Sequence, residues 1–377
     1  LEAPSSVLVT GETTEEGVLV RRSVANECGL CGQRSPLISE GPGVCSNCIR
    51  DHRRDALRIA GSRHAVSRKP FDLPQRPPDT PDGVPCPLCA RGCVLGPGEG
   101  GFCGLREGDG RRLHQLAGTP AGGLLEWYRD SLPTNCVADW VCSGSKRRGK
   151  HNLAVFYASC TLNCLFCQNW HFRQVAPLRR SLLSSEALAG AANDRTYCVC
   201  FFGGDPASQM PHALDAARRL AERGTVVCWE TAGTSHPRLL DRALELSLTT
   251  GGCVKFDLKA HDEGLHIALT GASNRRTLEN FARAAFRARE RRQPPLVIAS
   301  TLLVPGYVEA QEVGQIARFI AEIDPSTPYA LLGFAPHFLM DDLPVTSLVQ
   351  AQAAEAAARD EGLSNVRVGN RHLLAAH

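Results

Sequence analysis

The sequence has little of what would place it in a membrane or outside the cell. It has two Met, four Trp and five Lys, and its 42 basic side chains nearly balance 39 acidic ones. No run approaches the roughly 18 uncharged apolar residues of a membrane span, and the amino terminus lacks a signal-peptide core. A net charge of +3 does not favour a nucleic-acid or membrane-surface protein. We therefore expect a cytoplasmic protein without membrane or nucleic-acid partners.

Cysteine is abundant, with 17 residues in a chain of 377. In a small secreted protein they would indicate disulfides, but a chain of this length buries enough surface to fold without them. Most of them lie in short clusters, which indicates metal or iron–sulfur ligation. Four others fall in apolar runs, and we expect these to be small buried side chains: Cys198, Cys200, Cys228 and Cys253.

The composition changes several times along the chain and divides it into six expected segments. In order, these are a flexible lead-in (1–25), a four-cysteine module (26–50), an Arg- and Pro-rich linker (51–85) with a short helix at Asp51–Ala60, a cysteine-containing extension (86–150), a core (151–340), and a carboxyl-terminal helix and strand (341–377). The small cysteine-rich segments therefore precede one larger domain.

The core alternates apolar runs with amphipathic stretches, the pattern of βα units around parallel strands. The expected strands are Leu153–Ala158, Tyr197–Phe202, Thr225–Glu230, Cys253–Leu258, Leu296–Leu303 and Tyr329–Gly333. The expected helices include Met210–Arg223, Arg238–Leu248, Thr277–Arg291 and Ala310–Ile323. Six such units predict an α/β fold, a partial or full (β/α) barrel, with a doubly wound sheet as the alternative.

Three cysteines, Cys160, Cys164 and Cys167, follow the first strand within eight residues. Three thiolates on a 4Fe-4S cluster leave one iron free for an exogenous ligand. The alternative is a zinc site completed by a distant Cys or by His171.

The ends of the next strands carry glycines and charged residues. Gly203-Gly204-Asp205 follows the second strand, at the rim where barrel enzymes keep their sites, and glycines let a ligand approach the backbone closely. On the fourth strand Asp257 and Lys259 alternate and therefore point to the same face. Charges inside a barrel mouth are costly unless they pair or bind a charged ligand. A structural Asp257–Lys259 pair is the alternative interpretation.

The motif Cys160-x3-Cys164-x2-Cys167 resembles the signature of the radical S-adenosylmethionine (SAM) superfamily. The resemblance implies a TIM-like (β/α)6 radical SAM barrel and a 4Fe-4S cluster whose open iron binds SAM. It also implies that flavodoxin or ferredoxin reduces the cluster. SAM is then cleaved to methionine and a 5′-deoxyadenosyl radical, which abstracts hydrogen from an unknown substrate. Gly203, Gly204 and Asp205 would meet the SAM amino group, although the family has Glu at the third position.

Later motifs resemble those of pyruvate formate-lyase activating enzymes, namely Glu230-Thr-Ala-Gly233, Phe256-Asp-Leu-Lys259, Leu269–Asn274 and Leu303–Gly306. This resemblance implies the following roles: Lys259 at the SAM carboxylate, Val304 near the adenosyl group, His337 on the ribose side, and a monovalent cation held by Glu230, Thr231 and Asp257. Residues 84–370 are more similar to the radical enzyme of the AmmeMemoRadiSam system. An activase acting on a protein glycine and an enzyme modifying a small molecule or peptide are the two alternatives for the downstream reaction.

The amino-terminal cysteines form two sets of four. The first set is Cys28, Cys31, Cys45 and Cys48, two knuckles whose spacing predicts a structural zinc site, with rubredoxin-like iron as the alternative. The second set is Cys86, Cys89, Cys93 and Cys103, for which zinc and an auxiliary iron–sulfur cluster both stay open. Cys136 and Cys142 could join either. A zinc-ribbon binding protein on a degenerate barrel is the competing hypothesis for the whole chain.

Overall fold

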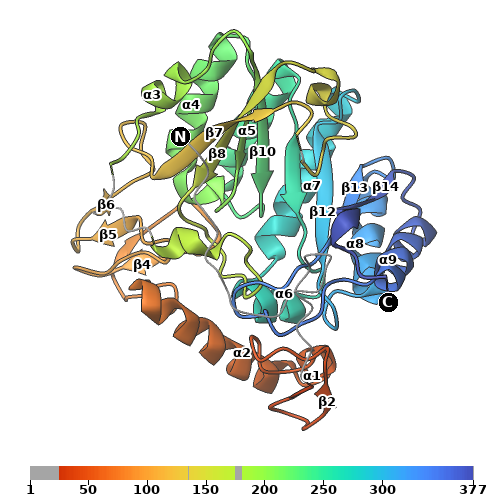
Figure 1. The fold of residues 1–377 in the computed structure, drawn as a ribbon. Coiled ribbons are helices and arrows are strands. Elements are labelled where there is room, and N and C mark those ends of the chain that lie inside the picture. Colours follow the sequence, from red (N-terminus) through yellow and green to blue (C-terminus); the bar gives the residue numbers. More distant parts are fainter. Residues whose placement is uncertain (1–24, 135, 175–180, 377) are drawn as a thin grey trace, which may run out of the picture.

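The computed structural model describes residues 25–134, 136–174 and 181–376, and its centre is one eight-stranded sheet (Figure 1). Strand β7 pairs antiparallel with β8 at one edge, and the strands from β8 to β14 are parallel. The strands are β7 (Leu125–Ser131), β8 (His151–Tyr157), β9 (Thr196–Phe202), β10 (Val226–Thr231), β11 (Val254–Asp257), β12 (Val297–Leu303), β13 (Tyr329–Gly333) and β14 (Val366–Gly369).

The strands are ordered in space as they are in sequence, with β7 and β14 at the two edges. A doubly wound sheet requires a reversal of strand order, so the structure excludes that alternative. The fold is the expected partial α/β barrel, and the six strands expected in the core are all present. Strand β7 was not expected.

Helices cover the outer face of the sheet (Figure 1). They are α3 (Ser185–Gly190), α4 (Met210–Glu222), α5 (Pro237–Thr250), α6 (Glu263–Thr270), α7 (Arg275–Arg287), α8 (Ala310–Ile323) and α9 (Leu348–Asp360). Helix α7, for example, buries an apolar stripe that includes Phe281, whose ring packs edge-on against Phe256 of β11 with 5.4 Å between the ring centres. The main core therefore lies between the sheet and its helices, and the inner face is left for the site.

In Figure 1 the first helices of the amino-terminal region run along the bottom of the molecule, and its later short strands lie on the left side. Its elements are β1 (Asn26–Glu27), β2 (Arg34–Ser35), α1 (Ser46–Asp51), α2 (Arg53–Arg68), β3 (Val84–Pro85), β4 (Val94–Leu95), β5 (Arg106–Gly108) and β6 (Leu113–Gln115). Short 3-10 turns are η1 (Lys69–Phe71), η2 (Ser143–Lys146), η3 (Trp170–Gln174), η5 (Pro206–Gln209), η6 (Ala288–Glu290) and η7 (Arg371–Leu373). Helix α2 extends past the expected Asp51–Ala60, and residues 1–24 of the expected lead-in lie outside the described residues.

Hydrogen bonds hold this region on the barrel. The Asp342 carboxylate accepts from Asn26 Nδ2 at 2.8 Å, from Ser39 Oγ at 2.7 Å and from the Glu40 amide at 2.7 Å. At the other end of α2, Asn163 Nδ2 donates to Ser67 Oγ at 2.9 Å. Since Asn163 lies between Cys160 and Cys164, α2 braces the loop that carries the three-cysteine motif. No helix among the described residues is long and apolar enough to cross a membrane.

Candidate functional site

The three-cysteine loop follows β8 and opens on a cavity of about 260 Å³, which we call the cluster cavity. Cys160, Cys164 and Cys167 all line it, and they are the only cysteines among its described lining residues. Cys164 is buried and the other two are half-buried; burial raises the pKa of Cys164 to about 11. Three thiols can bind three irons of a 4Fe-4S cluster, and the fourth iron then has no protein ligand. The cysteines that line this cavity therefore fit a cluster with one open iron.

Gly203 and Gly204 form a rim of the cluster cavity at the end of β9. Both have left-handed backbones, with φ of +63° and +54°. A Cβ on Gly204 would lie 2.0 Å from the Tyr157 carbonyl oxygen, and one on Gly203 would lie 2.0 Å from the Phe156 ring. No other residue fits here, so the chain presents bare backbone to the cavity, as the sequence predicts.

Asp205 is buried behind this rim and is not among the cavity-lining residues. Its carboxylate accepts hydrogen bonds from Thr231 Oγ1 at 3.0 Å, Thr161 Oγ1 at 3.2 Å and Thr234 Oγ1 at 3.4 Å. Burial raises the Asp205 pKa, while the amide and hydroxyl donors act in the opposite direction. Asp205 therefore ties the cysteine loop to the ends of β9 and β10. Sequence reasoning missed Thr161 and Thr234, because their common acceptor is apparent only in three dimensions.

Asp257 and Lys259 both line the cluster cavity and form an ion pair with each other. The Lys259 side chain is 11% exposed, its ammonium lying 5.6 Å from the Phe166 ring centre, whereas Asp257 is 39% exposed. Burial alone would lower the Lys259 pKa, but the Asp257 carboxylate and the Cys164 thiolate raise it above its ordinary value. The structural pair is therefore present, and its lysine also lines the cluster cavity; a contact of Lys259 with SAM stays a prediction.

Two residues expected at the site lie elsewhere. Val304 is 1% exposed and packed in the main core, and His337 is exposed at the surface. Neither lines the cluster cavity. The structure does not bring them to the other site residues, and their roles remain predictions.

Glu230 and Lys255 form an ion pair of 2.6 Å inside the barrel, where Lys255 is 2% exposed. The Lys255 ammonium also lies 3.1 Å from the sulfurs of both Cys136 and Cys200. Burial would lower its pKa, but those thiolates and Glu230 raise it well above the ordinary value. Sequence reasoning missed Lys255, although it lies on β11 two residues before Asp257 and continues the alternation of Asp257 and Lys259.

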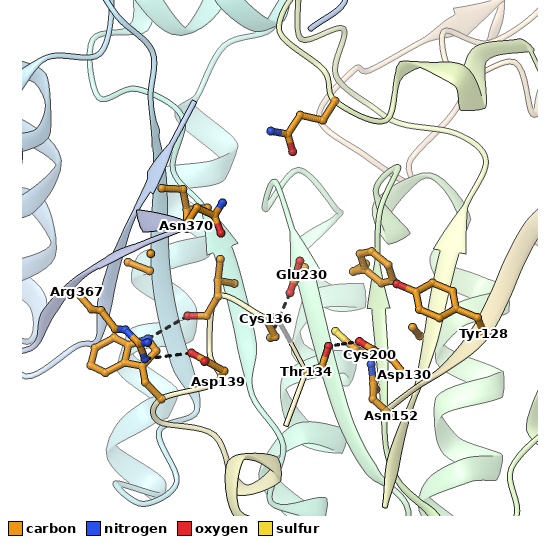
Figure 2. A pocket seen from close by; sticks show the side chains of 18 residues that line it. Tyr128, Asp130, Thr134, Cys136, Asp139, Asn152, Cys200, Glu230, Arg367 and Asn370 are labelled. Carbon is orange, nitrogen blue, oxygen red and sulfur yellow. Dashed lines mark hydrogen bonds and ion pairs between the residues drawn. The ribbon is translucent and has the colours of Figure 1, made fainter. Parts of the chain in front are cut away.

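A second cavity of about 330 Å³, which we call the inner cavity, adjoins the first (Figure 2). Glu230, Phe202, Gln168, Val137 and Leu332 line both. In Figure 2 Glu230 points into the middle of the inner cavity, toward Cys136 at 3.6 Å. Substrate-sized space therefore continues from the cysteine loop into the barrel.

The walls of the inner cavity carry polar groups on both sides (Figure 2). The guanidinium of Arg367, from β14, lies 3.2 Å from the Asp139 carboxylate. Tyr128 of β7 stands on the opposite wall.

The remaining barrel cysteines form one cluster, of which Cys136 and Cys200 also line the inner cavity. Cys198, Cys200, Cys228 and Cys253 are buried as expected, and Cys136 and Cys142 pack against them. The structure therefore places Cys136 and Cys142 in the barrel interior instead of bringing them to either amino-terminal set. Cys228 and Cys253 are cross-strand neighbours whose sulfurs lie 3.8 Å apart.

The first amino-terminal set is brought together as one site. The sulfurs of Cys28, Cys31, Cys45 and Cys48 all lie within 4.8 Å of one another, with pairs at 3.8 and 3.9 Å. Burial opposes ionisation of Cys28, but amides of Cys31, Cys45 and Leu30 hold its pKa at about 6. A tetrahedral ion with metal–sulfur bonds of about 2.3 Å has ligand separations of about 3.8 Å, so this group can hold one metal ion.

Comparison with known proteins agrees with this geometry. Residues 154–320 match the family model of the radical SAM superfamily. A Methanocaldococcus jannaschii protein provisionally named a glycyl-radical enzyme activating enzyme is 26% identical over 226 residues, covering 57% of this chain and 80% of its own. The isethionate sulfite-lyase activating enzyme of Oleidesulfovibrio alaskensis is 31% identical over 148 residues, covering 38% and 45%.

Among solved structures, that of Streptococcus suis SuiB bound to S-adenosylmethionine is similar with a TM-score of 0.44 and 13% identity, covering 59% of this chain and 51% of SuiB. The family match begins in β8, includes the cysteine loop and the glycine rim, and ends in α8. Residues 154–320 therefore form a radical SAM superfamily domain.

Proposed function

We propose that this enzyme cleaves SAM reductively in the cluster cavity and removes a hydrogen atom from a substrate held in the inner cavity. The observation that carries the proposal is that the two cavities share Glu230, Phe202 and Gln168. A substrate in the inner cavity would therefore lie beside SAM without leaving the barrel. When bound on Cys160, Cys164 and Cys167, the 4Fe-4S cluster supplies the electron for cleavage and an open iron for SAM.

The residues of the cluster cavity suit the two charged ends of SAM. The Lys259 ammonium is available to the carboxylate as a charge-assisted donor, and the backbone at Gly203 and Gly204 is available to the amino group. Asp205 would act by positioning, since its oxygens are already occupied by hydroxyl donors. Roles for Val304 at the adenosyl group and His337 at the ribose rest on the family resemblance alone.

The geometry supports some of the other expected cofactors and partners better than others. Zinc in the first cysteine set is favoured by the tetrahedral sulfur spacing. A monovalent cation at Glu230, Thr231 and Asp257 is poorly supported, because lysines already neutralise both carboxylates and the Thr231 hydroxyl donates to Asp205. We take reduced flavodoxin or ferredoxin as the electron donor.

Two classes of substrate are candidates for the hydrogen abstraction. The names of the relatives favour an activase that takes hydrogen from a glycine of a partner protein. A small molecule or peptide is favoured instead by the inner cavity, whose volume of about 330 Å³ suits a compact ligand.

The experiment that tests the reaction class is anaerobic reconstitution with iron and sulfide, followed by incubation with SAM and dithionite. We expect methionine and 5′-deoxyadenosine in equal amounts, measured by mass spectrometry. A protein that holds its full cluster and binds SAM but releases no 5′-deoxyadenosine would contradict the proposal.

A further inference from the structure

Arg173 is a buried cation in the wall of the cluster cavity that the proposed function does not use. It lies in the turn η3, which follows the cysteine loop, and 5% of its surface is exposed. Its Nη1 atom is inaccessible to water and has no hydrogen-bond partner among the described residues. Because an arginine side chain stays charged in proteins, this nitrogen carries part of a buried charge without a hydrogen bond. Such a group is costly unless an anion lies close to it.

The other charged residues of the cluster cavity are already paired. The described residues that line it include three cations and two carboxylates. Lys255 pairs with Glu230, and Lys259 pairs with Asp257. No described carboxylate pairs with Arg173, which leaves one positive charge in excess while the three thiols are protonated.

Aromatic rings hold the Arg173 guanidinium in this position. Its central carbon lies 4.8 Å from the centre of the Phe172 ring and 4.7 Å from the centre of the Phe338 ring. Trp170 stacks on Phe338 with 5.5 Å between the ring centres. Contacts of this kind fix the position of a guanidinium but do not neutralise its charge.

Phe338 presents its ring from a strained backbone. Its φ of +55° lies in the left-handed region, which a bulky residue rarely adopts and which is often found near functional sites. The amide of the next residue, Leu339, donates to the Leu165 carbonyl at 2.9 Å. Leu165 follows Cys164 in the cysteine loop. The ring that holds Arg173 is therefore anchored to the loop that carries the cluster ligands.

The thiols of the cysteine loop are the anions that this cavity offers to Arg173. Burial raises the pKa of Cys164, and the charges of Lys259 and Arg173 act in the opposite direction. Thiols ionise when they hold a metal cluster, so the loop then supplies the negative charge that Arg173 lacks. The second cysteine set does not line this cavity, and its metal stays a prediction: Cys86, Cys89, Cys93 and Cys103.

We propose that the buried charge of Arg173 stabilises the reduced state of the cluster at Cys160, Cys164 and Cys167. Reduction adds one electron from the external donor, and no bond or proton changes place. A fixed cation close to the cluster favours the form with the extra negative charge, and the net charge around a cluster sets its reduction potential. The inference rests on the proposed function for the presence of the cluster. Sequence reasoning missed Arg173, because arginine is usually exposed and its burial depends on the fold.

A redox titration of the reconstituted protein tests this inference, with the cluster followed by electron paramagnetic resonance and dithionite as the reductant. In Arg173→Met we expect the equilibrium constant for one-electron reduction to fall at least tenfold, a midpoint potential more negative by about 59 mV. Arg173→Lys keeps the charge and should stay within about threefold of the parent. The matched control Arg111→Met, at an exposed arginine, should leave the potential unchanged.

Arg173→Met with the potential of the parent would overturn the inference. If that variant also bound SAM more weakly, Arg173 would instead contact the carboxylate of SAM. A parent protein that holds no cluster after reconstitution would contradict the proposed function and this inference together. A parent that holds its cluster and cleaves SAM, with Arg173→Met at the same potential, would overturn this inference alone.

Thermal stability gives a second readout that does not depend on SAM. In the full-length protein purified without iron, Arg173→Met should melt at a higher temperature than the parent, because it removes a buried charge that has no anion. After reconstitution this advantage should disappear, because the cluster thiolates then compensate Arg173. An iron-free variant less stable than the iron-free parent would mean that Arg173 already has a compensating partner, and would overturn the inference.

Discussion

The Lys255 ammonium lies 2.6 Å from the Glu230 carboxylate, between the cluster cavity and the inner cavity. Strands β10 and β11 place the two residues directly opposite each other. Lys255 is nearly inaccessible, while Glu230 keeps a third of its surface exposed. The pair therefore presents one carboxylate to both cavities and holds it in place with a buried cation.

Replacing Lys255 should destabilise the fold, since it leaves Glu230 partly buried without its cation. We expect Lys255→Met to lower the free energy of unfolding by about 2–3 kcal/mol in urea titrations. The double variant Lys255→Met/Glu230→Gln should recover most of that loss, because no charge is then left unpaired. Lys150→Met, at an exposed lysine, is the matched control. If the double variant is no more stable than Lys255→Met, the unpaired Glu230 carboxylate is not the cause of the lost stability.

Replacing Lys259 should lower the affinity for SAM more than it lowers the stability of the fold. Lys259→Met keeps the apolar stem and removes the charge, so we expect an affinity for SAM lower by about ten- to hundredfold in equilibrium binding, the loss of one charge-assisted hydrogen bond. The melting temperature without SAM should stay near that of the parent, because Asp257 is exposed enough to be hydrated. Normal SAM binding with a much lower melting temperature would mean that Lys259 is only structural.

Stability should fall in mild acid because of His64. Its Nε2 contacts the Ala268 carbonyl and its Nδ1 the Asn163 amide, and burial lowers its pKa from 6.5 to about 4. Between these values the unfolded chain binds the proton more tightly, so stability is kept above pH 6.5 and lost as the pH falls toward 4. We expect this histidine to cost about 2 kcal/mol on going from pH 7.5 to pH 5.

Urea unfolding of the reconstituted protein at these two pH values measures the effect. His64→Gln should show a smaller difference between them, whereas His372→Gln, at the exposed carboxyl-terminal turn, should behave like the parent. Equal pH dependence in all three proteins would rule out His64 as the acid-sensitive group.

Removing the first metal should loosen its module without stopping SAM cleavage. Cys28→Ser/Cys31→Ser should lose about one zinc per chain and weaken amide protection over residues 26–50, because the metal ties both knuckles together. Formation of 5′-deoxyadenosine should persist. Cys142→Ala, which removes a thiol in the barrel interior, should keep its zinc. Loss of cleavage with the barrel and its clusters intact would instead give this module a part in catalysis.

The periodicity of the core predicted most of the fold because buried parallel strands give short apolar runs. Strand β7 was not predicted, because its sequence, Leu125–Ser131, mixes charged residues with apolar ones along an exposed sheet edge. The cysteine loop and its glycine rim could be predicted because each is a local motif. The contact of Lys255 with Cys136 could not, since it joins residues 119 positions apart and depends on how the 136–146 segment enters the barrel.

The central claim is that Cys160, Cys164 and Cys167 hold the cluster that cleaves SAM. Its most direct test compares 5′-deoxyadenosine formation by the parent with that of Cys160→Ala/Cys164→Ala/Cys167→Ala, both reconstituted anaerobically and reduced with dithionite. We predict that the parent forms 5′-deoxyadenosine and that the variant forms none, although it stays folded by circular dichroism. A folded triple variant that still produces 5′-deoxyadenosine would contradict the assignment.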